Sequence, residues 1–137
     1  MTHPNAELLR RAYDAFDRGN VEPLIAVLAD DISWRDSNLG PVAGRYTGKQ
    51  EVLGLFGKTM EVYEGTLRVT VVDILADDTY GVVLTREQGS VGGEVVTWTG
   101  VHLWTFPDGL CEQFEAYVDG DYQRFWSSRN TSVAGAR

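Results

Sequence analysis

Residues 97–106 read Thr97-Trp98-Thr99-Gly100-Val101-His102-Leu103-Trp104-Thr105-Phe106. In a β-strand, successive side chains alternate between the two faces. One face of this segment would therefore carry three aromatic rings, a glycine and His102, whereas the other carries only threonine and aliphatic residues. A strand that turns aromatic rings and one titratable group to the same side is typical of a pocket wall. The alternative is a core strand whose histidine only hydrogen-bonds to a neighbour, and the segment alone leaves both open.

Three more segments around this one have strand character. The predicted strands span residues 66–75, 79–88, 95–106 and 110–118, and turn signals separate them at Asp77-Asp78, Gly92-Gly93 and Pro107-Asp108-Gly109. Such short links predict an antiparallel meander. The length of the Gly92-Gly93 turn decides which side chains share the face of His102. A two-residue turn pairs Glu87 with Trp98, Thr85 with Gly100 and Val83 with His102, and it turns Arg86 outward; a three-residue loop brings Arg86 and Leu84 inward instead.

The N-terminal half has helical periodicity instead. A stripe of Leu8, Leu9, Ala12, Tyr13 and Phe16 predicts a helix capped by Asn5 and ended by Gly19. A short helix with Pro23 in its first turn follows, and a capping-box pattern, Thr47 with Gln50, predicts the start of a third helix.

Between the second and third helices, residues 32–36 predict a short strand, and residues 37–46 a loop. Ile32, Trp34 and Asp36 share one face of that strand. Three helices followed by a long antiparallel sheet predict an α+β fold, a cone-shaped curved sheet whose helices cover a concave cavity. We expect a single domain over residues 1–126, ending in a helical turn at residues 122–126, and a disordered tail over residues 127–137.

Composition narrows the possible partners. The chain has 137 residues and a net charge of −8, from 12 basic and 20 acidic residues. Without a cluster of Lys or Arg, neither nucleic acid nor a membrane is an expected partner. The single cysteine, Cys111, leaves no internal disulfide, and with one interior histidine it argues against a metal site. No apolar run or leader pattern predicts a membrane span or secretion, so a cytoplasmic protein is expected.

Several segments carry a family resemblance. Residues 9–20 (LRRAYDAFDRGN), 28–36 (LADDISWRD), 101–109 (VHLWTFPDG) and 114–119 (FEAYVD), together with Gly48, resemble SnoaL-like proteins. These belong to the nuclear-transport-factor-2-like superfamily, which includes ketosteroid isomerase, scytalone dehydratase and polyketide cyclases. The resemblance covers roughly residues 6–126. It implies the fold more specifically than the reaction, because this fold hosts enzymes, adaptors and binding proteins.

The resemblance implies roles for two residues. Asp36 falls where ketosteroid isomerase has its general base, and His102 where that enzyme has the protonated aspartic acid of its oxyanion hole. The position of the oxyanion-hole tyrosine of ketosteroid isomerase falls near Ala12 of this chain, and Tyr13 is one place away from it. This departure from the pattern argues against steroid isomerisation. An aspartate facing a histidine is more similar to the dehydratases and cyclases. The implied function is cofactor-independent acid/base chemistry, with Asp36 as base and His102 as acid or orienting partner.

The expected ligand is a small hydrophobic molecule that bears a carbonyl or hydroxyl group. Its predicted contacts are Trp34, Trp104, Trp98, Tyr13, Phe16, Phe56, Met60, Phe114 and Val118. Three alternatives stay open: Asp36 only caps the following loop; the protein is an epoxide-opening hydrolase, although an Asp-Arg-Asp set is not evident; or it binds a ligand without turnover. An apolar patch is expected on the outer face of the sheet, and it predicts a homodimer through Val101, Leu103, Val69, Val71, Val82 and Leu84.

Overall fold

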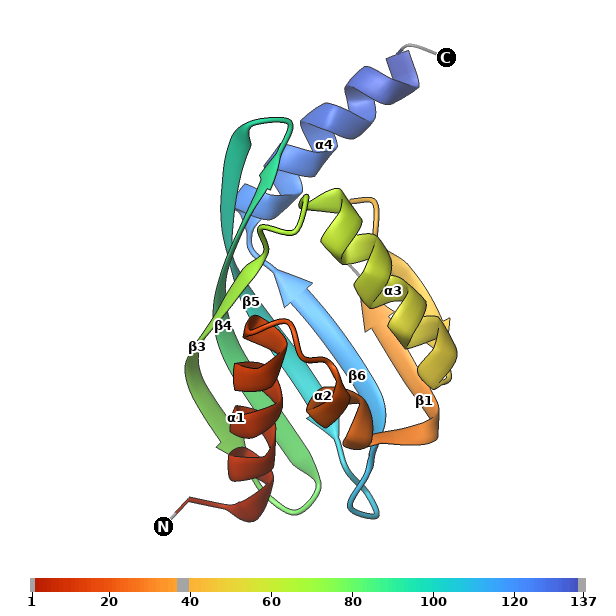
Figure 1. The fold of residues 1–137 in the computed structure, drawn as a ribbon, viewed down its shortest axis with the longest axis vertical. Helices are drawn as coiled ribbons and strands as arrows, with labels where there is room; N and C mark the ends of the chain where they lie inside the picture. The colour runs from red at the N-terminus through yellow and green to blue at the C-terminus, as the bar shows by residue number, and fades with distance from the viewer. Residues whose placement is uncertain (1, 37–39, 136–137) are drawn as a thin grey trace.

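The computed structural model describes residues 2–36 and 40–135, the last six of them by their backbone alone. Its elements are α1 (Pro4–Asp17), α2 (Glu22–Ala26), β1 (Leu28–Asp36), β2 (Gly44–Thr47), α3 (Lys49–Val62), β3 (Arg68–Ala76), β4 (Tyr80–Val91), β5 (Glu94–Thr105), β6 (Cys111–Val118) and α4 (Gly120–Gly135). The strands form one six-stranded sheet in the order β2-β1-β6-β5-β4-β3. Helices α1, α2 and α3 cover one face of this curved sheet, and α4 lies at one end (Figure 1). The predicted α+β class is confirmed.

Two features of the sheet differ from the expectation of a purely antiparallel meander. Strands β3 to β6 are antiparallel neighbours as predicted, but β1 pairs with β6 in parallel, so the sheet is mixed. No tight turn links these two strands, and nothing local therefore imposes an antiparallel direction. Residues 44–46 of the predicted loop, together with Thr47, predicted as a helix cap, form β2 and pair with β1. Four residues next to glycine and proline give too short a pattern to identify as a strand.

The predicted register of β4 and β5 is confirmed. Glu87 pairs with Trp98, Thr85 with Gly100 and Val83 with His102. Gly92 and Gly93 have φ values of 58° and 84°, the left-handed conformation that a tight two-residue hairpin turn requires. Arg86 is consequently exposed on the outer face, and Glu87 points inward.

On β3 the prediction of outward-facing residues is wrong. Val69 pairs with Glu87 and Val71 with Thr85, so both belong to the inner face, where Val69 is buried. The register shifts between Val71 and Asp73, and this irregularity leaves Val72 exposed. A bulge has no signature in the alternation of apolar residues, which explains the error.

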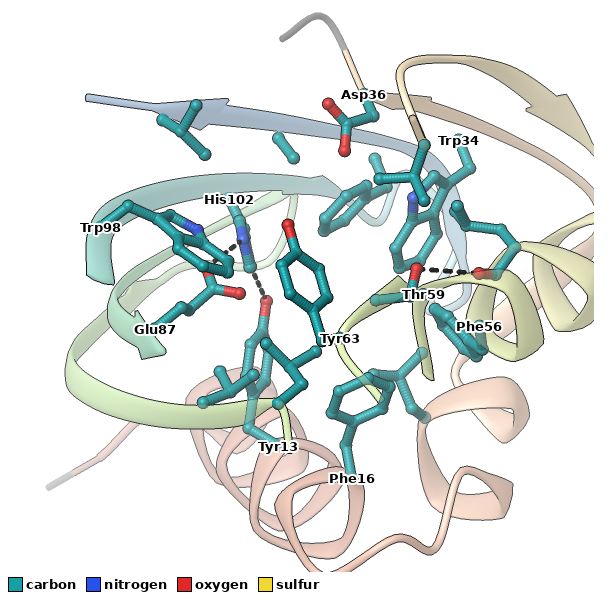
Figure 2. Close-up of a pocket in the computed structure, with 18 of the residues that line it drawn as sticks. Tyr13, Phe16, Trp34, Asp36, Phe56, Thr59, Tyr63, Glu87, Trp98 and His102 are labelled. Atoms are coloured by element: carbon teal, nitrogen blue, oxygen red, sulfur yellow. Dashed lines mark hydrogen bonds and ion pairs between the residues drawn. The ribbon is translucent and has the colours of Figure 1, made fainter. Parts of the chain in front are cut away.

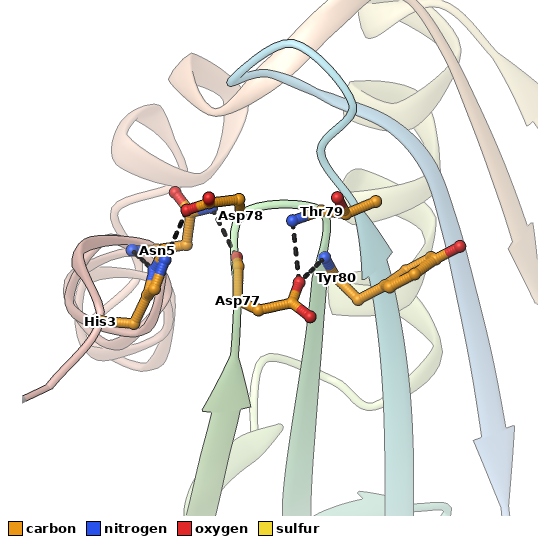
Figure 3. Close-up of polar contacts among 6 residues, drawn as sticks. All are labelled: His3, Asn5, Asp77, Asp78, Thr79 and Tyr80. Carbon is orange, nitrogen blue, oxygen red and sulfur yellow. Dashed lines mark hydrogen bonds and ion pairs between the residues drawn. The ribbon is translucent and has the colours of Figure 1, made fainter.

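Two predicted helix caps are also replaced. His3, not Asn5, caps α1: its Nδ1 accepts the Asn5 backbone N–H at 3.0 Å, while its Nε2 lies 2.8 Å from Asp78 Oδ1 (Figure 3). The Asn5 side chain instead donates to the Asp77 carbonyl at 3.0 Å. At α3 the N-cap residue is Gly48 in place of Thr47, and the Glu51 carboxylate accepts a hydrogen bond from the Thr47 backbone N–H at 2.8 Å. The contacts of His3 with Asp78 and of Asn5 with Asp77 fasten the start of α1 to the β3–β4 turn.

Two hydrophobic clusters hold the layers together. The larger lies between the sheet and the helices α1 to α3, with Leu9, Ile32, Val52 and Trp104 among its buried members. The smaller joins the end of α3 to β5 and α4 through Tyr63, Val96, Trp98, Tyr122 and Trp126.

Helix α4 extends beyond the predicted turn at residues 122–126 and continues to Gly135, across much of the region expected to be a disordered tail. Arg129 fastens this extension. Its Nη2 lies 3.3 Å from Glu94 Oε1, and its Cζ lies over the Phe125 ring, 4.5 Å from the ring centroid. Residues 136 and 137 lie outside the described part of the chain, as do residues 37–39 of the predicted loop. Within the described residues, no helix combines the length and apolar character that crossing a bilayer requires.

Candidate functional site

A cavity of about 110 Å³ lies between the inner face of the sheet and the helices. Asp36 from β1 and His102 from β5 both line it (Figure 2). Of the predicted ligand contacts, those that line it are Tyr13, Phe16, Trp34, Phe56, Trp98, Phe114 and Val118. The sequence-selected aspartate and histidine therefore open into one space whose walls are largely aromatic.

Strand pairing explains why Asp36 and His102 meet. Asp36 pairs with Ala116 on β6, and Ala116 pairs with His102 on β5, so the three residues form one row across the sheet. Since adjacent strands lie ~4.8 Å apart, the backbones of Asp36 and His102 are roughly 10 Å apart. The small side chain of Ala116 leaves the space above the row open. A compact molecule can contact both groups there.

Aromatic side chains pack against the row of Asp36, Ala116 and His102 on the side of β1. Trp34 stacks on Phe114 with ring centroids 3.6 Å apart, and Phe56 meets Trp34 edge-on at 5.4 Å. Phe114 also meets the His102 ring edge-on at 5.2 Å. Rings packed in this way have little freedom to rotate, and they offer flat surfaces for a ring-containing ligand.

The hydrogen bond that Trp104 donates to Tyr13 indicates where the hydrogen atoms around His102 lie. The indole Nε1–H can only donate, and it donates to the Tyr13 hydroxyl oxygen at 3.0 Å. The Tyr13 proton is then directed to His102 Nδ1, 2.5 Å away. A neutral imidazole whose Nδ1 accepts carries its hydrogen on Nε2. Burial raises the pKa of Tyr13 well above its ordinary value, so this hydroxyl keeps its proton at neutral pH.

On the other side of the imidazole lies Glu87, which the sequence analysis did not select as a site residue. Its Oε2 is 3.5 Å from His102 Nε2 and accepts a hydrogen bond from the Thr85 hydroxyl at 2.8 Å. Only 10% of the Glu87 side chain is exposed. A glutamate in the inward-facing row of β4 is the signal that could have identified it, because carboxylates are rarely buried without a partner.

Gly100 makes room for that carboxylate. A Cβ at this position would lie 2.5 Å from the Thr85 hydroxyl oxygen and 2.7 Å from Glu87 Oε2. Both distances are shorter than van der Waals contact allows. The glycine in the quoted strand is therefore part of the site, since it allows Glu87 to lie beside His102.

Two predicted contacts take other positions. Trp104 is fully buried behind Tyr13, with the two rings edge-on at 5.9 Å, so it supports a lining residue without lining the cavity itself. Met60 lies on α3, which presents Leu55, Phe56 and Thr59 to the cavity instead. Alternation and helical period indicate a face, but not how deep a side chain lies in the core.

The remaining ionisable groups do not form a metal-binding cluster: across residues 2–36 and 40–135, no three His, Cys, Asp or Glu side chains gather in a way that could hold an ion. Cys111 is fully buried, and burial raises its pKa to about 12, so the thiol stays protonated.

The SnoaL-like domain family has a sequence model that matches residues 9–114. This chain belongs to the SnoaL-like family. The resemblance inferred from the sequence is thereby confirmed, and the fold and cavity of this SnoaL-like protein agree with it.

Relatives and solved structures cover nearly the whole SnoaL-like chain. A Mycobacterium tuberculosis protein described as uncharacterized is 28% identical over 124 residues, which are 88% of this chain and 95% of that protein. An NTF2-like protein of unknown function from Burkholderia pseudomallei is 25% identical with a TM-score of 0.74, over 86% of this chain and 92% of its own. TerC, co-crystallized with polyporic acid, is 21% identical with a TM-score of 0.77, over 90% and 98%, a likeness of fold alone.

Proposed function

We propose that this SnoaL-like protein binds a small hydrophobic molecule bearing a carbonyl or hydroxyl group and performs cofactor-independent acid/base chemistry on it, of the isomerase, cyclase or dehydratase type. The observation that carries the proposal is the row Asp36–Ala116–His102, which places a carboxylate and an imidazole in one aromatic cavity. The co-crystallization of TerC with polyporic acid supports a small organic ligand in this fold.

In the proposed reaction, Asp36 removes a proton from carbon beside the ligand carbonyl and returns it to another atom. His102 offers Nε2–H, because its Nδ1 is occupied by the Tyr13 hydroxyl. The Nε2 contact with Glu87 is long, at 3.5 Å, so a ligand oxygen can compete for that hydrogen. Tyr13 and Glu87 hold the imidazole in the orientation that this donation needs.

The experiment is deuterium exchange at the carbon beside a carbonyl. The probe is 1-indanone in D₂O, and the disappearance of its α-hydrogens is followed by proton NMR. We expect exchange faster than in buffer alone at the same pH, and we expect indane, the same ring system without the carbonyl, to inhibit it competitively. If 1-indanone binds but exchanges at the buffer rate, the acid/base proposal is wrong and a binding protein remains.

We also propose that two copies pair through the outer face of the sheet. Val82 pairs with Leu103 and Leu84 with Val101, which forms an apolar area on β4 and β5. Val72, Leu75 and Tyr117 extend it and are 55%, 58% and 43% exposed. An apolar area of this kind is costly to leave in water. We expect sedimentation equilibrium to give a dimer that Val101→Lys converts to a monomer; a wild-type monomer at micromolar concentration would exclude this pairing.

A further inference from the structure

Glu87 brings a carboxylate into the cavity without a strong cationic partner. Its side chain is 10% exposed, and its ion-pair contact is with His102, whose Nε2 lies 3.5 Å from Glu87 Oε2. The Tyr13 hydroxyl donates to the other ring nitrogen, so that imidazole is neutral. In the described part of the chain, no lysine or arginine lines the cavity. Because buried carboxylates are usually paired with a cation, Glu87 requires an explanation.

One oxygen of this carboxylate is available to a ligand. Among the described residues, Thr85 is the hydrogen-bond donor to the carboxylate, and it binds Oε2 at 2.8 Å. Figure 2 shows the other oxygen, Oε1, turned away from His102 and toward the middle of the cavity. A carboxylate oxygen can only accept, so the ligand group that fits beside Oε1 carries an N–H or O–H.

Aromatic rings lie around Glu87. Trp98 is its cross-strand partner on β5. The Tyr63 ring lies over Gly89, the next residue of β4 on the same face, where a Cβ would be 2.6 Å from Tyr63 Cδ1. The rings of Tyr63 and Trp98 pack together with centroids 5.4 Å apart. The faces of such rings attract an organic cation, and a carboxylate beside them adds a charge-assisted hydrogen bond to an ammonium group.

The electrostatic field in the cavity is negative. Three tyrosines line it: Tyr13, Tyr63 and Tyr122. Burial is the largest cause of the raised pKa at each of them, and the charge of Glu87 raises all three pKa values further. Asp36 adds to the rise at Tyr63 and Tyr122. A field that opposes a phenolate also opposes an anionic ligand and favours a cationic one.

We infer that the ligand of this cavity is an organic ammonium compound, whose protonated amine donates to Glu87 Oε1 beside the rings of Trp98 and Tyr63. This deepens the proposed function, on which it rests for the use of the cavity as a ligand site. The carbonyl or hydroxyl group of the ligand lies at the row of Asp36 and His102, and the positive charge lies at Glu87. The cavity thereby selects a cation over a neutral molecule or an anion of the same shape.

The test compares three ligands that share one ring system and differ in charge at neutral pH. The compound 2-aminoindane is protonated, indane is neutral and indane-2-carboxylate is an anion. Their affinities for the wild-type protein are measured by quenching of the fluorescence of the cavity tryptophans. We expect 2-aminoindane to bind about tenfold more tightly than indane, the gain typical of a hydrogen bond to a charged group. Indane-2-carboxylate should bind more weakly than indane.

Glu87→Gln removes the charge and keeps an amide oxygen that can accept the Thr85 hydrogen bond. We expect this variant to bind 2-aminoindane no more tightly than indane, with an unchanged affinity for indane. Its urea midpoint should be unchanged or higher, because the variant no longer buries a carboxylate without a strong cationic partner. Glu61→Gln is the matched control: it makes the same chemical change at an exposed position of α3 and should retain the preference for 2-aminoindane.

Each other outcome counts against the inference. Equal affinities of the wild type for the three ligands, or tightest binding of the carboxylate, would overturn it without any variant. A preference for 2-aminoindane that Glu87→Gln retains would also overturn it, and a lower urea midpoint with that result would make Glu87 a structural residue. The α-hydrogen exchange of 1-indanone separates the two proposals. If 1-indanone exchanges but the preference for the cation is absent, only this inference fails; if the preference is present without exchange, only the proposed reaction fails.

Discussion

Asp36→Asn is expected to slow the α-hydrogen exchange of 1-indanone by about 10²- to 10⁴-fold, the usual loss when a general base is removed. Asparagine nearly matches the shape of aspartate, but its amide cannot accept a proton from carbon at neutral pH. Since the cavity walls are unchanged, the affinity for 1-indanone should stay within a few-fold of the wild type. The measurement is the exchange rate at saturating ketone, together with the dissociation constant from fluorescence.

Two variants sharpen this result. Asp31→Asn removes a carboxylate of the same strand that is exposed on β1, and it should leave the exchange rate unchanged. His102→Gln should cost as much as Asp36→Asn if the imidazole donates the proton, and less if it only orients the ligand. An Asp36→Asn protein that exchanges at the wild-type rate would refute the role of this carboxylate, whichever way His102 behaves.

Gly100→Ala is expected to lower the free energy of unfolding by about 1–3 kcal/mol, the usual cost of adding a methyl group to a packed interior. The new Cβ would lie 2.5 Å from the Thr85 hydroxyl oxygen and 2.7 Å from Glu87 Oε2, so the carboxylate must leave its place beside His102. Urea unfolding measures the first effect. The ¹⁵N shifts of the imidazole measure the second, because the chain has only two histidines and the signals of His102 are readily assigned.

Gly54→Ala is the matched control for this substitution. Gly54 lies inside α3, and nothing would lie within 4 Å of its Cβ. Alanine there should raise the free energy of unfolding by about 0.5–1 kcal/mol, because glycine loses more backbone entropy in a helix. Opposite signs for the two variants would identify crowding at Gly100 as the cause, whereas equal stability of Gly100→Ala and wild type would contradict the packing around Glu87.

Much of the sheet could be predicted because its contacts are local. The Gly92-Gly93 turn set the register of β4 and β5, and with it the inward side of His102, Trp98 and Glu87. The period of two also placed Trp34 and Asp36 on one face of β1, and both line the cavity. These inferences need only the alternation of side chains and one turn.

The rest depends on contacts between segments far apart in the chain. The direction in which β1 meets β6 has no local signal, and neither does the register shift in β3. The place of Glu87 beside His102 depends on the missing side chain at Gly100, thirteen positions later, a contact that strand alternation alone does not indicate. Tyr63 lies just beyond α3, where helical period ends, and Gly89 decides the direction of its ring, which lines the cavity.

The parallel pairing of β1 with β6 also affects the order in which the chain folds during synthesis. A nascent chain that has not yet reached Cys111 contains β1 and β2, but Trp34 has no Phe114 to stack on and Asp36 has no Ala116 beside it. The hairpins of β3, β4 and β5 join close neighbours in sequence and carry the low entropic cost of short loops. The wall that holds Asp36 is therefore completed only with the last strand, and the cavity is among the final parts of the protein to form.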